Sequence, residues 1–503
     1  MTQITTCRCL INGEWTDVQA EHYCDVFNPS TGEVIARTPM CAAADVDRAV
    51  EAAKAAFPAW RETPVTDRAR VMFRFRELMD NHADEIARLI TREHGKTYAE
   101  ALASVQRGVE MIEFACGIPS LIGGEIVENL APGVDSETVR HPLGVVAGIT
   151  PFNFPAMVPL WMYPNALTCG NCFILKPSER VPLSAIRSVE LLLEAGLPPG
   201  VFSIVHGGKE CVDALLTHPD IKAISFVGST AVAKHVYETG TAHGKRVQAA
   251  GGAKNHMVIM PDADMPPTVA GVKNSAFGCA GERCMAGSLA VPVGEVADEF
   301  VGRLCEVAAK MKTGRTDTDA TVDMGPVISQ PHLERVRGYI EIAVQEGAVL
   351  ALDGRKTTVA DAPNGFFLGP TVIDHAKPGM RVVKEEIFGP VLTVCRVGSL
   401  DEAFELGEQC VYGNGAVIFT RDGRAAREFK HRFAAGMIGI NVGVPAPMAW
   451  FPFTGWRGSF FGDLHIQGKE GVAFYTQQRM TLSRWFEPAK QDVHDPVWRP
   501  GKA

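Results

Sequence analysis

Residues 172–207, CFILKPSERVPLSAIRSVELLLEAGLPPGVFSIVHG, contain the pattern that decides the fold. Two short apolar runs, 172–177 and 201–207, flank a segment whose apolar residues recur at helical spacing. Short apolar runs that alternate with helices are typical of βαβ units, in which parallel strands share one sheet and helices cover its faces. The stretch therefore predicts a strand, a helix and a second, parallel strand.

The same alternation continues on both sides of this unit. Further apolar runs are GVVAGIT (144–150), AISFVG (223–228) and RVQAAGG (246–252). A second alternating set begins near residue 262, whereas residues 41–130 have a mostly helical pattern. We therefore expect an α/β protein with two doubly wound parallel-sheet lobes and a functional site in the crevice between them. The C-terminal stretch VAFYTQQRMTLSRWFEP alternates like an edge strand, which would pair either with another subunit or within its own domain.

The bulk composition excludes several classes of protein. The chain has 503 residues, of which 46% are hydrophobic and 21% charged, and its net charge is −9. An acidic chain without a basic face is a poor partner for nucleic acid. No stretch reaches ~18 apolar residues, so no membrane span is expected. The 13 cysteines follow no framework spacing, and no secretory or mitochondrial leader is visible, so a cytoplasmic location is expected.

Two segments that follow predicted strands point to a nucleotide. Gly228 ends a strand, and Ser229 and Thr230 then open a helix as N-cap residues, whose free N–H groups favour a phosphate. Lys176 and Glu179 follow another strand, where they would hold a ribose hydroxyl and leave no room for a 2′-phosphate. An ordinary capped helix and a solvated loop are the alternatives. Neither a G-x-G-x-x-G nor a P-loop pattern is present.

One thiol stands in an unusual context. Cys284 lies in the glycine-rich segment GCAGERCMAGS (278–288), directly after Arg283. Glycines allow a sharp turn that brings main-chain N–H groups to the sulfur, and a neighbouring cation lowers the pKa of a thiol. Cys169 and Cys172 form a C-x-x-C, but they lie where a helix end runs into a buried strand, and no second pair completes a metal site.

Seven motifs in one order resemble the aldehyde dehydrogenase superfamily. They are ITPFNFP (149–155), LKPSERVPLSA (175–185), FVGST (226–230), GGAKNH (251–256), GERCMAGS (281–288), EEIFGPV (385–391) and FPFTGWRGS (451–459). The resemblance implies an NAD-binding domain of residues 1–125 and 148–261 and a catalytic domain of residues 262–455. It also implies a small β oligomerisation arm, residues 126–147 and 470–503, in a homotetramer or a dimer.

The resemblance also assigns roles to individual residues. Cys284 would attack an aldehyde, while Asn153 and the Cys284 N–H hold the oxyanion, and hydride transfer to NAD would leave a thioester on Cys284. Glu386 would hold the nicotinamide ribose. The residues implied around the cofactor are Thr150, Phe152, Lys176, Glu179, Arg180, Gly228, Ser229, Glu386 and Phe388. No metal is implied.

One family residue is missing. Most members hydrolyse the thioester with a glutamate whose position here is Ala250. Loss of a general base typically costs ~10²–10⁴ in rate. The thioester would therefore persist for a better nucleophile, and coenzyme A is one. Glu282, next but one to Cys284, is the alternative base.

Two arginines give the sequence a resemblance to one branch of this superfamily, the CoA-acylating methylmalonate-semialdehyde dehydrogenases. Arg107 and Arg283 would clamp the carboxylate of malonate semialdehyde or its 2-methyl form. The products would be acetyl-CoA or propionyl-CoA, NADH and CO₂, in the breakdown of valine, β-alanine or inositol. This sequence differs from that branch at Glu282, a position where the branch frequently has glutamine. The alternatives are ordinary surface arginines, a hydrolytic aldehyde dehydrogenase that releases a free acid, and a non-catalytic binding protein on the same fold.

Overall fold

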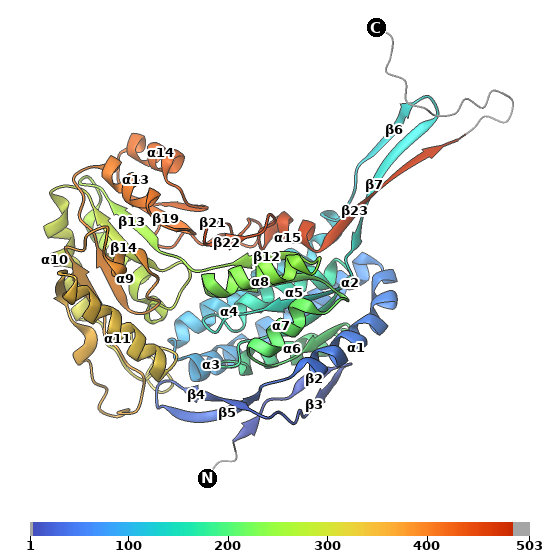
Figure 1. Ribbon diagram of the computed structural model, residues 1–503, viewed down its shortest axis with the longest axis horizontal. Coiled ribbons are helices and arrows are strands. Elements are labelled where there is room, and N and C mark those ends of the chain that lie inside the picture. The colour runs from blue at the N-terminus through green and yellow to red at the C-terminus, as the bar shows by residue number, and fades with distance from the viewer. Residues whose placement is uncertain (1–3, 486–503) are drawn as a thin grey trace, which may run out of the picture.

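Two parallel sheets form the framework of the molecule, which is a computed structural model that describes residues 4–485 (Figure 1). The first sheet has the strand order β22-β12-β11-β8-β9-β10-β2-β3, and its five strands from β12 to β10 are parallel. Its strands are β2 (Cys9–Ile11), β3 (Glu14–Thr16), β8 (Val145–Ile149), β9 (Cys172–Lys176), β10 (Phe202–Ile204), β11 (Ile221–Val227), β12 (Arg246–Ala250) and β22 (Phe460–Phe461). The βαβ prediction from residues 172–207 is confirmed, as are the neighbouring strands.

The first sheet has a topological switch point between β8 and β11. From β8 the chain builds outward through β9 and β10, whereas β11 and β12 are added on the other side of β8. At such a point the connections leave in opposite directions and open a crevice at the carboxyl ends of the strands. Thr150 follows β8, Lys176 ends β9 and Gly228 follows β11, so all three lie at this edge.

Helices cover both faces of the first sheet, and one large apolar core joins them to it. Helix α4 matters for the site because it carries Arg107, and it begins at a capping box in which Thr97 and Glu100 exchange hydrogen bonds. The helices of this lobe are α1 (Ala43–Glu62), α2 (Val65–Asn81), α3 (Ala83–His94), α4 (Tyr98–Cys116), α5 (Met157–Thr168), α6 (Leu183–Glu194), α7 (Lys209–Thr217) and α8 (Thr230–Ala242), with the 3₁₀ helix η1 (Ile118–Ser120).

The second sheet has the order β15-β16-β17-β14-β13-β19-β20 and is parallel except for β15. Its strands are β13 (Asn255–Ile259), β14 (Gly287–Pro292), β15 (Val349–Leu352), β16 (Thr371–Asp374), β17 (Val391–Val394), β19 (Gly415–Phe419) and β20 (Met437–Ile440). The helices are α9 (Met265–Phe277), η2 (Gly278–Gly281), α10 (Val296–Ala309), α11 (Gln330–Gln345), η3 (Gly354–Lys356), α12 (Arg381–Lys384), α13 (Leu400–Glu408) and α14 (Gly423–Arg432).

The chain crosses between the sheets earlier than residue 262. β12 ends at Ala250 in the first sheet, and β13 begins at Asn255 in the second. The expected boundary between residues 261 and 262 therefore falls after a strand that already belongs to the second lobe. Periodicity alone did not reveal the crossing because β12 and β13 are both short apolar runs separated only by residues 251–254. The two-lobed α/β class itself is confirmed.

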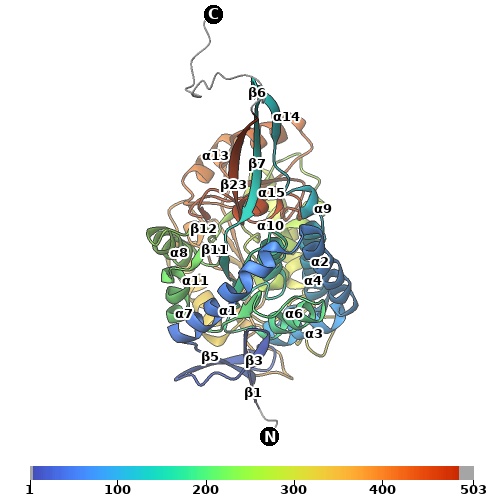
Figure 2. The same cartoon turned by 90° about the vertical axis from the view of Figure 1, so that its right-hand side faces the viewer.

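A three-stranded antiparallel arm projects from the body of the molecule (Figures 1 and 2). Its order is β23-β7-β6, formed by β6 (Ile126–Ala131), β7 (Val134–Pro142) and β23 (Thr476–Arg484). The predicted C-terminal strand thus pairs with β7 of the same chain, and it starts later than expected because residues 472–474 belong to helix α15 (Gly468–Phe474). Residues 486–503 of the expected arm lie outside the described residues.

The remaining strands form two small sheets. β1 (Thr5–Thr6), β5 (Glu33–Pro39) and β4 (Tyr23–Asn28) make one, and β18 (Tyr412–Gly413) pairs with β21 (Trp456–Arg457) in the other. Within residues 4–485, no helix combines the length and the apolar composition that crossing a membrane would need.

A buried asparagine ties the base of the arm to the first lobe. Asn171 Oδ1 accepts hydrogen bonds from the N–H groups of Leu143 (2.7 Å) and Gly144 (3.1 Å). Its Nδ2 donates to the carbonyls of Ala166 (3.1 Å) and Tyr475 (2.9 Å). One side chain therefore connects the turn from β7 to β8, the end of α5 and the start of β23.

We expect Asn171→Ala to lower the free energy of unfolding by about 3 kcal/mol, because buried backbone donors and acceptors lose their partners. Urea unfolding followed by fluorescence would measure the change. The matched control is Asn81→Ala at the exposed end of α2, which should shift stability by less than about 0.5 kcal/mol. Equal effects of the two substitutions would contradict this role for Asn171.

Candidate active site

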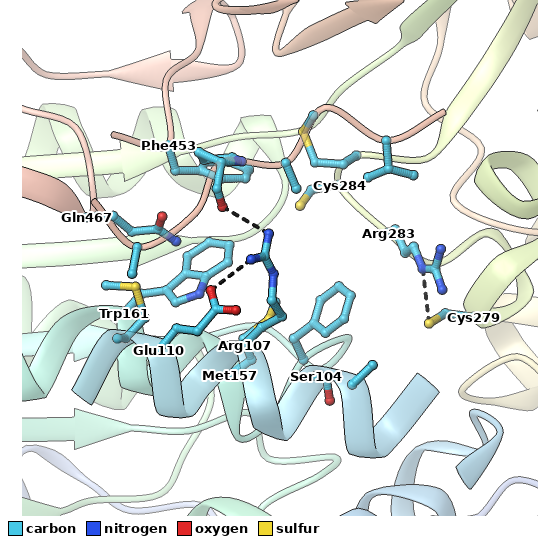
Figure 3. Close-up of a pocket in the computed structure, with 18 of the residues that line it drawn as sticks. Ser104, Arg107, Glu110, Met157, Trp161, Cys279, Arg283, Cys284, Phe453 and Gln467 are labelled. Atoms are coloured by element: carbon cyan, nitrogen blue, oxygen red, sulfur yellow. Dashed lines mark hydrogen bonds and ion pairs between the residues drawn. The ribbon is translucent and has the colours of Figure 1, made fainter. Parts of the chain in front are cut away.

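Two cavities meet at the side chain of Cys284. The first, called the crevice cavity, has a volume of about 830 Å³ and opens at the switch point of the first sheet. The second, called the α4 cavity, has a volume of about 310 Å³ and lies on the other side of the sulfur (Figure 3). The α4 cavity is lined by residues of α4 and α5 and of the segments 279–285, 444–453 and Gln467. Among the described residues, only Cys284 lines both cavities.

The loop before Cys284 is bent by a glycine with no room for a side chain. Gly281 has φ +71°, and a Cβ built on it would lie 2.0 Å from the carbonyl oxygen of Gly389. Cys279 and Ala280 also have positive φ, near 50°, which is a strained conformation for residues other than glycine. Such strain persists only where the surrounding structure over-determines the backbone. The turn therefore sets the direction in which the chain enters residues 282–284.

Two asparagines hold the backbone of the nucleophile. The carbonyl of Cys284 accepts hydrogen bonds from Nδ2 of Asn255 (2.9 Å) and Nδ2 of Asn414 (3.0 Å). Asn255 begins β13 and Asn414 precedes β19, which are neighbours in the second sheet. Sequence analysis missed both. Asn255 lies inside the motif GGAKNH, but Asn414 stands in an ordinary turn, and only the pairing of β13 with β19 brings it to the site.

The surroundings of Cys284 raise the pKa of its thiol to about 12. Burial is the main cause, and the nearby carboxylate of Glu386 adds to it. The N–H groups of Cys284 and Met285 and the charge of Arg283 lower the pKa, but by less. Arg283 thus lowers the pKa of this thiol, as expected of a neighbouring cation, but desolvation of the sulfur outweighs one cation.

Asn153, the residue expected to hold the oxyanion, lines the crevice cavity together with Cys284. Its Nδ2 donates to the carbonyl of Glu282 (3.1 Å), and its own carbonyl accepts from Nζ of Lys96 (2.7 Å). An amide nitrogen carries two protons, so the second one is available to a substrate oxygen. Lys96 thus positions the backbone of Asn153.

All nine residues predicted around a cofactor line the crevice cavity: Thr150, Phe152, Lys176, Glu179, Arg180, Gly228, Ser229, Glu386 and Phe388. These residues come from four separate segments of the sequence. One detail differs. Ser229 is the N-cap of α8 but makes no side-chain cap bond, and Thr230 is already helical, with its hydroxyl donating to the carbonyl of Gly458 (3.0 Å). The first N–H groups of α8 therefore remain available to an anion.

Lys176 and Glu179 form an ion pair at the end of β9. Nζ of Lys176 lies 3.0 Å from Oε2 of Glu179 and donates to the carbonyl of Gly207 (2.7 Å). Burial raises the pKa of Glu179, but the Lys176 charge and hydrogen bonds to the carboxylate outweigh it, so the pKa is lowered. Glu179 is therefore a fixed negative charge in the crevice cavity at neutral pH.

The side chain of Glu386 lies beside residues 251–254, which connect β12 to β13. Its Oε1 accepts a hydrogen bond from the N–H of Ala253 (2.9 Å), and a Cβ built on Gly252 would lie 2.4 Å from its Oε2. Burial raises the pKa of this carboxyl. A side chain at position 252 would therefore force the carboxylate of Glu386 to move.

Neither of the two positions considered for a general base presents a carboxylate to the sulfur of Cys284. Ala250 is buried at the end of β12 and lines neither cavity. Glu282 is fully buried behind Asn153, where its Oε1 accepts from the N–H of Ile328 (3.1 Å), and it also lines neither cavity. Burial holds the pKa of Glu282 well above its usual range. The alternative that Glu282 replaces the missing base is therefore not supported.

The two predicted clamp arginines line the α4 cavity but do not point at one another (Figure 3). Arg107 points into the cavity and pairs with Glu110, at 2.8 Å. Arg283 turns away, where Nε contacts Cys279 Sγ (3.1 Å) and Nη2 contacts Glu100 (3.0 Å). The expectation that both guanidiniums converge is therefore wrong. The strained loop and Glu100 hold Arg283 away from Arg107.

We expect alkylation of Cys284 by iodoacetamide to accelerate about tenfold per pH unit from about pH 7 to about pH 10, because the raised pKa keeps the thiol protonated below it. Mass spectrometry of the peptide that contains Cys284 would follow the reaction. Glu386→Gln should accelerate it by removing a nearby negative charge, whereas Glu385→Gln, whose carboxylate pairs with Arg381, should not. A plateau near pH 8 would show an acidic thiol instead.

Comparison with known proteins places this geometry in a family. The model of the aldehyde dehydrogenase family matches residues 15–481. The chain is 52% identical, over 96% of its length and 100% of the relative, to malonate-semialdehyde dehydrogenase 3 of Geobacillus kaustophilus.

Solved structures agree with this result. A methylmalonate-semialdehyde dehydrogenase from Oceanimonas doudoroffii is 51% identical, with a TM-score of 0.95 over 96% of this chain and 99% of that one. A protein from Sinorhizobium meliloti, complexed with NAD, is 45% identical, with a TM-score of 0.96 over 97% and 100% of the two chains. The chain, with its thiol placed between two cavities of a two-lobed α/β fold, belongs to the aldehyde dehydrogenase family.

Proposed function

We propose that this protein oxidises malonate semialdehyde or its 2-methyl form with NAD and transfers the acyl group to coenzyme A. The observation that carries the proposal is the position of Cys284, between a crevice suited to a nucleotide and a cavity that holds Arg107. The names of the similar proteins, malonate- and methylmalonate-semialdehyde dehydrogenases, support the substrate class. Residues 1–125 with 148–261 would bind NAD, and residues 262–455 would supply the nucleophile.

The crevice cavity fits a dinucleotide. The uncapped N-terminus of α8 at Gly228 and Ser229 would hold the pyrophosphate, and Lys176 with Glu179 would hold the adenosine ribose. Glu386 would hold the second ribose, beside Cys284. A bound NAD supplies the acceptor for a hydride. With these contacts, the redox chemistry would take place at the end of the cavity that Cys284 lines.

The thiolate of Cys284 attacks the aldehyde carbon, and the aldehyde oxygen becomes an oxyanion. The free proton of Asn153 Nδ2 and the N–H of Cys284 stabilise that charge in a site of low polarity, where donors fixed in advance are most effective. Collapse of the oxyanion expels the hydride and leaves a thioester on Cys284. The N–H groups near the sulfur assist ionisation of the thiol, which burial opposes.

The acyl group on Cys284 still carries the carboxylate of the substrate, and this carboxylate is then lost as CO₂. The carboxylate lies β to the thioester carbonyl, so cleavage of its C–C bond leaves an enolate that a proton converts to the acetyl or propionyl thioester. The thiolate of coenzyme A attacks this carbonyl, releases acyl-CoA and returns Cys284. Because Ala250 offers no base to activate water, the thiol of coenzyme A is the better acceptor.

The hydrolytic alternative keeps one supporting observation. Glu386 is a carboxyl group near Cys284 in the crevice cavity, with a pKa raised by burial, as a general base for water would need. We favour acyl transfer because Glu386 accepts a hydrogen bond from Ala253 and would be occupied by the ribose of a bound dinucleotide.

The arm supports a homo-oligomer, a tetramer or a dimer, as a further part of the proposal. Ile126 on β6 and Leu482 on β23 expose 66% and 58% of their surface, and β23 forms an open edge of the arm sheet. Exposed apolar side chains on a projecting sheet are suited to burial against a second copy of the chain.

To test acyl transfer, malonate semialdehyde and NAD are incubated with the enzyme, with and without coenzyme A. We expect NADH to form about 10²-fold faster in steady state with coenzyme A, because unassisted hydrolysis of the thioester is slow. A stoichiometric burst of NADH should appear without it. Equally fast turnover without coenzyme A, with accumulation of free acid, would establish the hydrolytic alternative.

The preference for NAD over NADP should depend on Glu179. Glu179→Gln removes a fixed negative charge beside Lys176, so we expect NADP to bind about tenfold more tightly. Fluorescence titration of each cofactor would measure the change. The matched control, Glu194→Gln at the exposed end of α6, should leave both affinities unchanged. An unchanged NADP affinity in Glu179→Gln would remove this residue from the cofactor site.

A further inference from the structure

The charged side chains of the α4 cavity already neutralise one another. Arg283 pairs with Glu100 at 3.0 Å, and Arg107 pairs with Glu110 at 2.8 Å. All four side chains line the cavity. A substrate carboxylate therefore enters a space without a free cation, and must compete with a resident carboxylate for a guanidinium.

Arg107 is the guanidinium that can exchange its partner. Its bond to Glu110 is its one short contact, since the other, from Nη2 to the carbonyl of Pro447, is 3.4 Å long. The side chains of Arg107 and Glu110 are 34% and 31% exposed, so water can solvate Glu110 once it is released. Arg283, in contrast, has polar neighbours at all three of its nitrogens.

Gln467 is a buried polar side chain without a partner. It is 3% exposed and lines the α4 cavity, and the Oε1 of its carboxamide has no hydrogen-bond partner among the described residues. Figure 3 shows the amide on the same side of Arg107 as Glu110. Its backbone has φ +77°, a strained conformation outside glycine. A buried amide left unpaired costs free energy unless a ligand completes its hydrogen bonds.

We propose that Arg107 and Gln467 together bind the acid end of the substrate, and that Glu110 is an internal competitor which the substrate's carboxylate displaces from Arg107. The identity of that substrate rests on the proposed function. The guanidinium offers two parallel N–H donors to a carboxylate, and the Gln467 Nε2 supplies another donor. Gln467 takes the place that Arg283 was expected to fill.

Because a substrate must displace Glu110, the site distinguishes aldehydes that carry a carboxylate from uncharged aldehydes. A short aldehyde with a terminal carboxylate exchanges one ion pair for another and gains the Gln467 hydrogen bond. An uncharged aldehyde of similar size leaves Arg107 on Glu110 and Gln467 unpaired. Discrimination of this kind depends on what each ligand leaves unsatisfied in the site.

The first experiment removes the competitor. We expect Glu110→Gln to lower the KM for malonate semialdehyde about tenfold, with kcat and the KM for propanal unchanged, because the neutral amide competes weakly for Arg107. Calorimetric titration with malonate, as a probe of the carboxylate site, should show the same gain in affinity. The matched control is Glu113→Gln on the outer side of α4, which pairs with Arg76 and should change neither substrate.

The second experiment removes the added donor. Gln467→Leu should raise the KM for malonate semialdehyde about tenfold and leave that for propanal unchanged. NAD affinity and melting temperature, measured in parallel, separate this effect from a folding defect. If the variant is unstable, Gln467→Glu provides the same test, since a carboxylate there should repel the substrate and spare propanal.

The outcomes separate this inference from the proposed function. If the wild type shows no preference for malonate semialdehyde over propanal, the substrate class of the proposed function fails. The malonate titration of Glu110→Gln then still decides the inference. If the preference exists but Glu110→Gln leaves the ratio of KM values and the malonate affinity unchanged, or raises the KM for the acid, Glu110 is not a competitor and the inference is overturned.

Discussion

The hydrogen bonds from Asn255 and Asn414 to the carbonyl of Cys284 are the constraint on which the site depends. Asn255 is the first residue after the chain crosses from one sheet to the other. The nucleophile is thereby attached to the second lobe while its sulfur faces cavities built largely by the first. These two hydrogen bonds fix the backbone of the residue whose side chain lines both cavities.

The site combines a reactive group with surroundings that restrain it. Burial and the Glu386 carboxylate keep the Cys284 thiol protonated, and resident carboxylates neutralise both arginines of the α4 cavity. Desolvation strengthens every charge interaction that forms inside such a site. Reactivity would thus arise mainly when ligands rearrange the charges: a dinucleotide that engages Glu386, and a carboxylate that displaces Glu110.

Local patterns predicted much of this protein. The alternation of apolar runs and helices predicted the strands of the first sheet, and the segments after β9 and β11 supplied Lys176, Glu179, Gly228 and Ser229, which all line one cavity. This succeeded because the carboxyl ends of parallel strands meet at one edge, so neighbours in the pattern become neighbours in space. The crossing at residues 251–254 was missed, because so short a connection between two apolar runs has no periodicity of its own.

The sequence by itself determined the fold class, since this depends on residue type and local spacing. Through the family resemblance it also singled out Cys284 as the candidate nucleophile and Ala250 as the position without the usual carboxylate. Only the tertiary structure decided how charges pair. It turned Arg283 toward Glu100, buried Glu282 behind Asn153, and brought Gln467 from the base of the arm to Arg107 on α4. The partner of a guanidinium depends on which carboxylate lies within a few ångströms, and that distance exists only after packing.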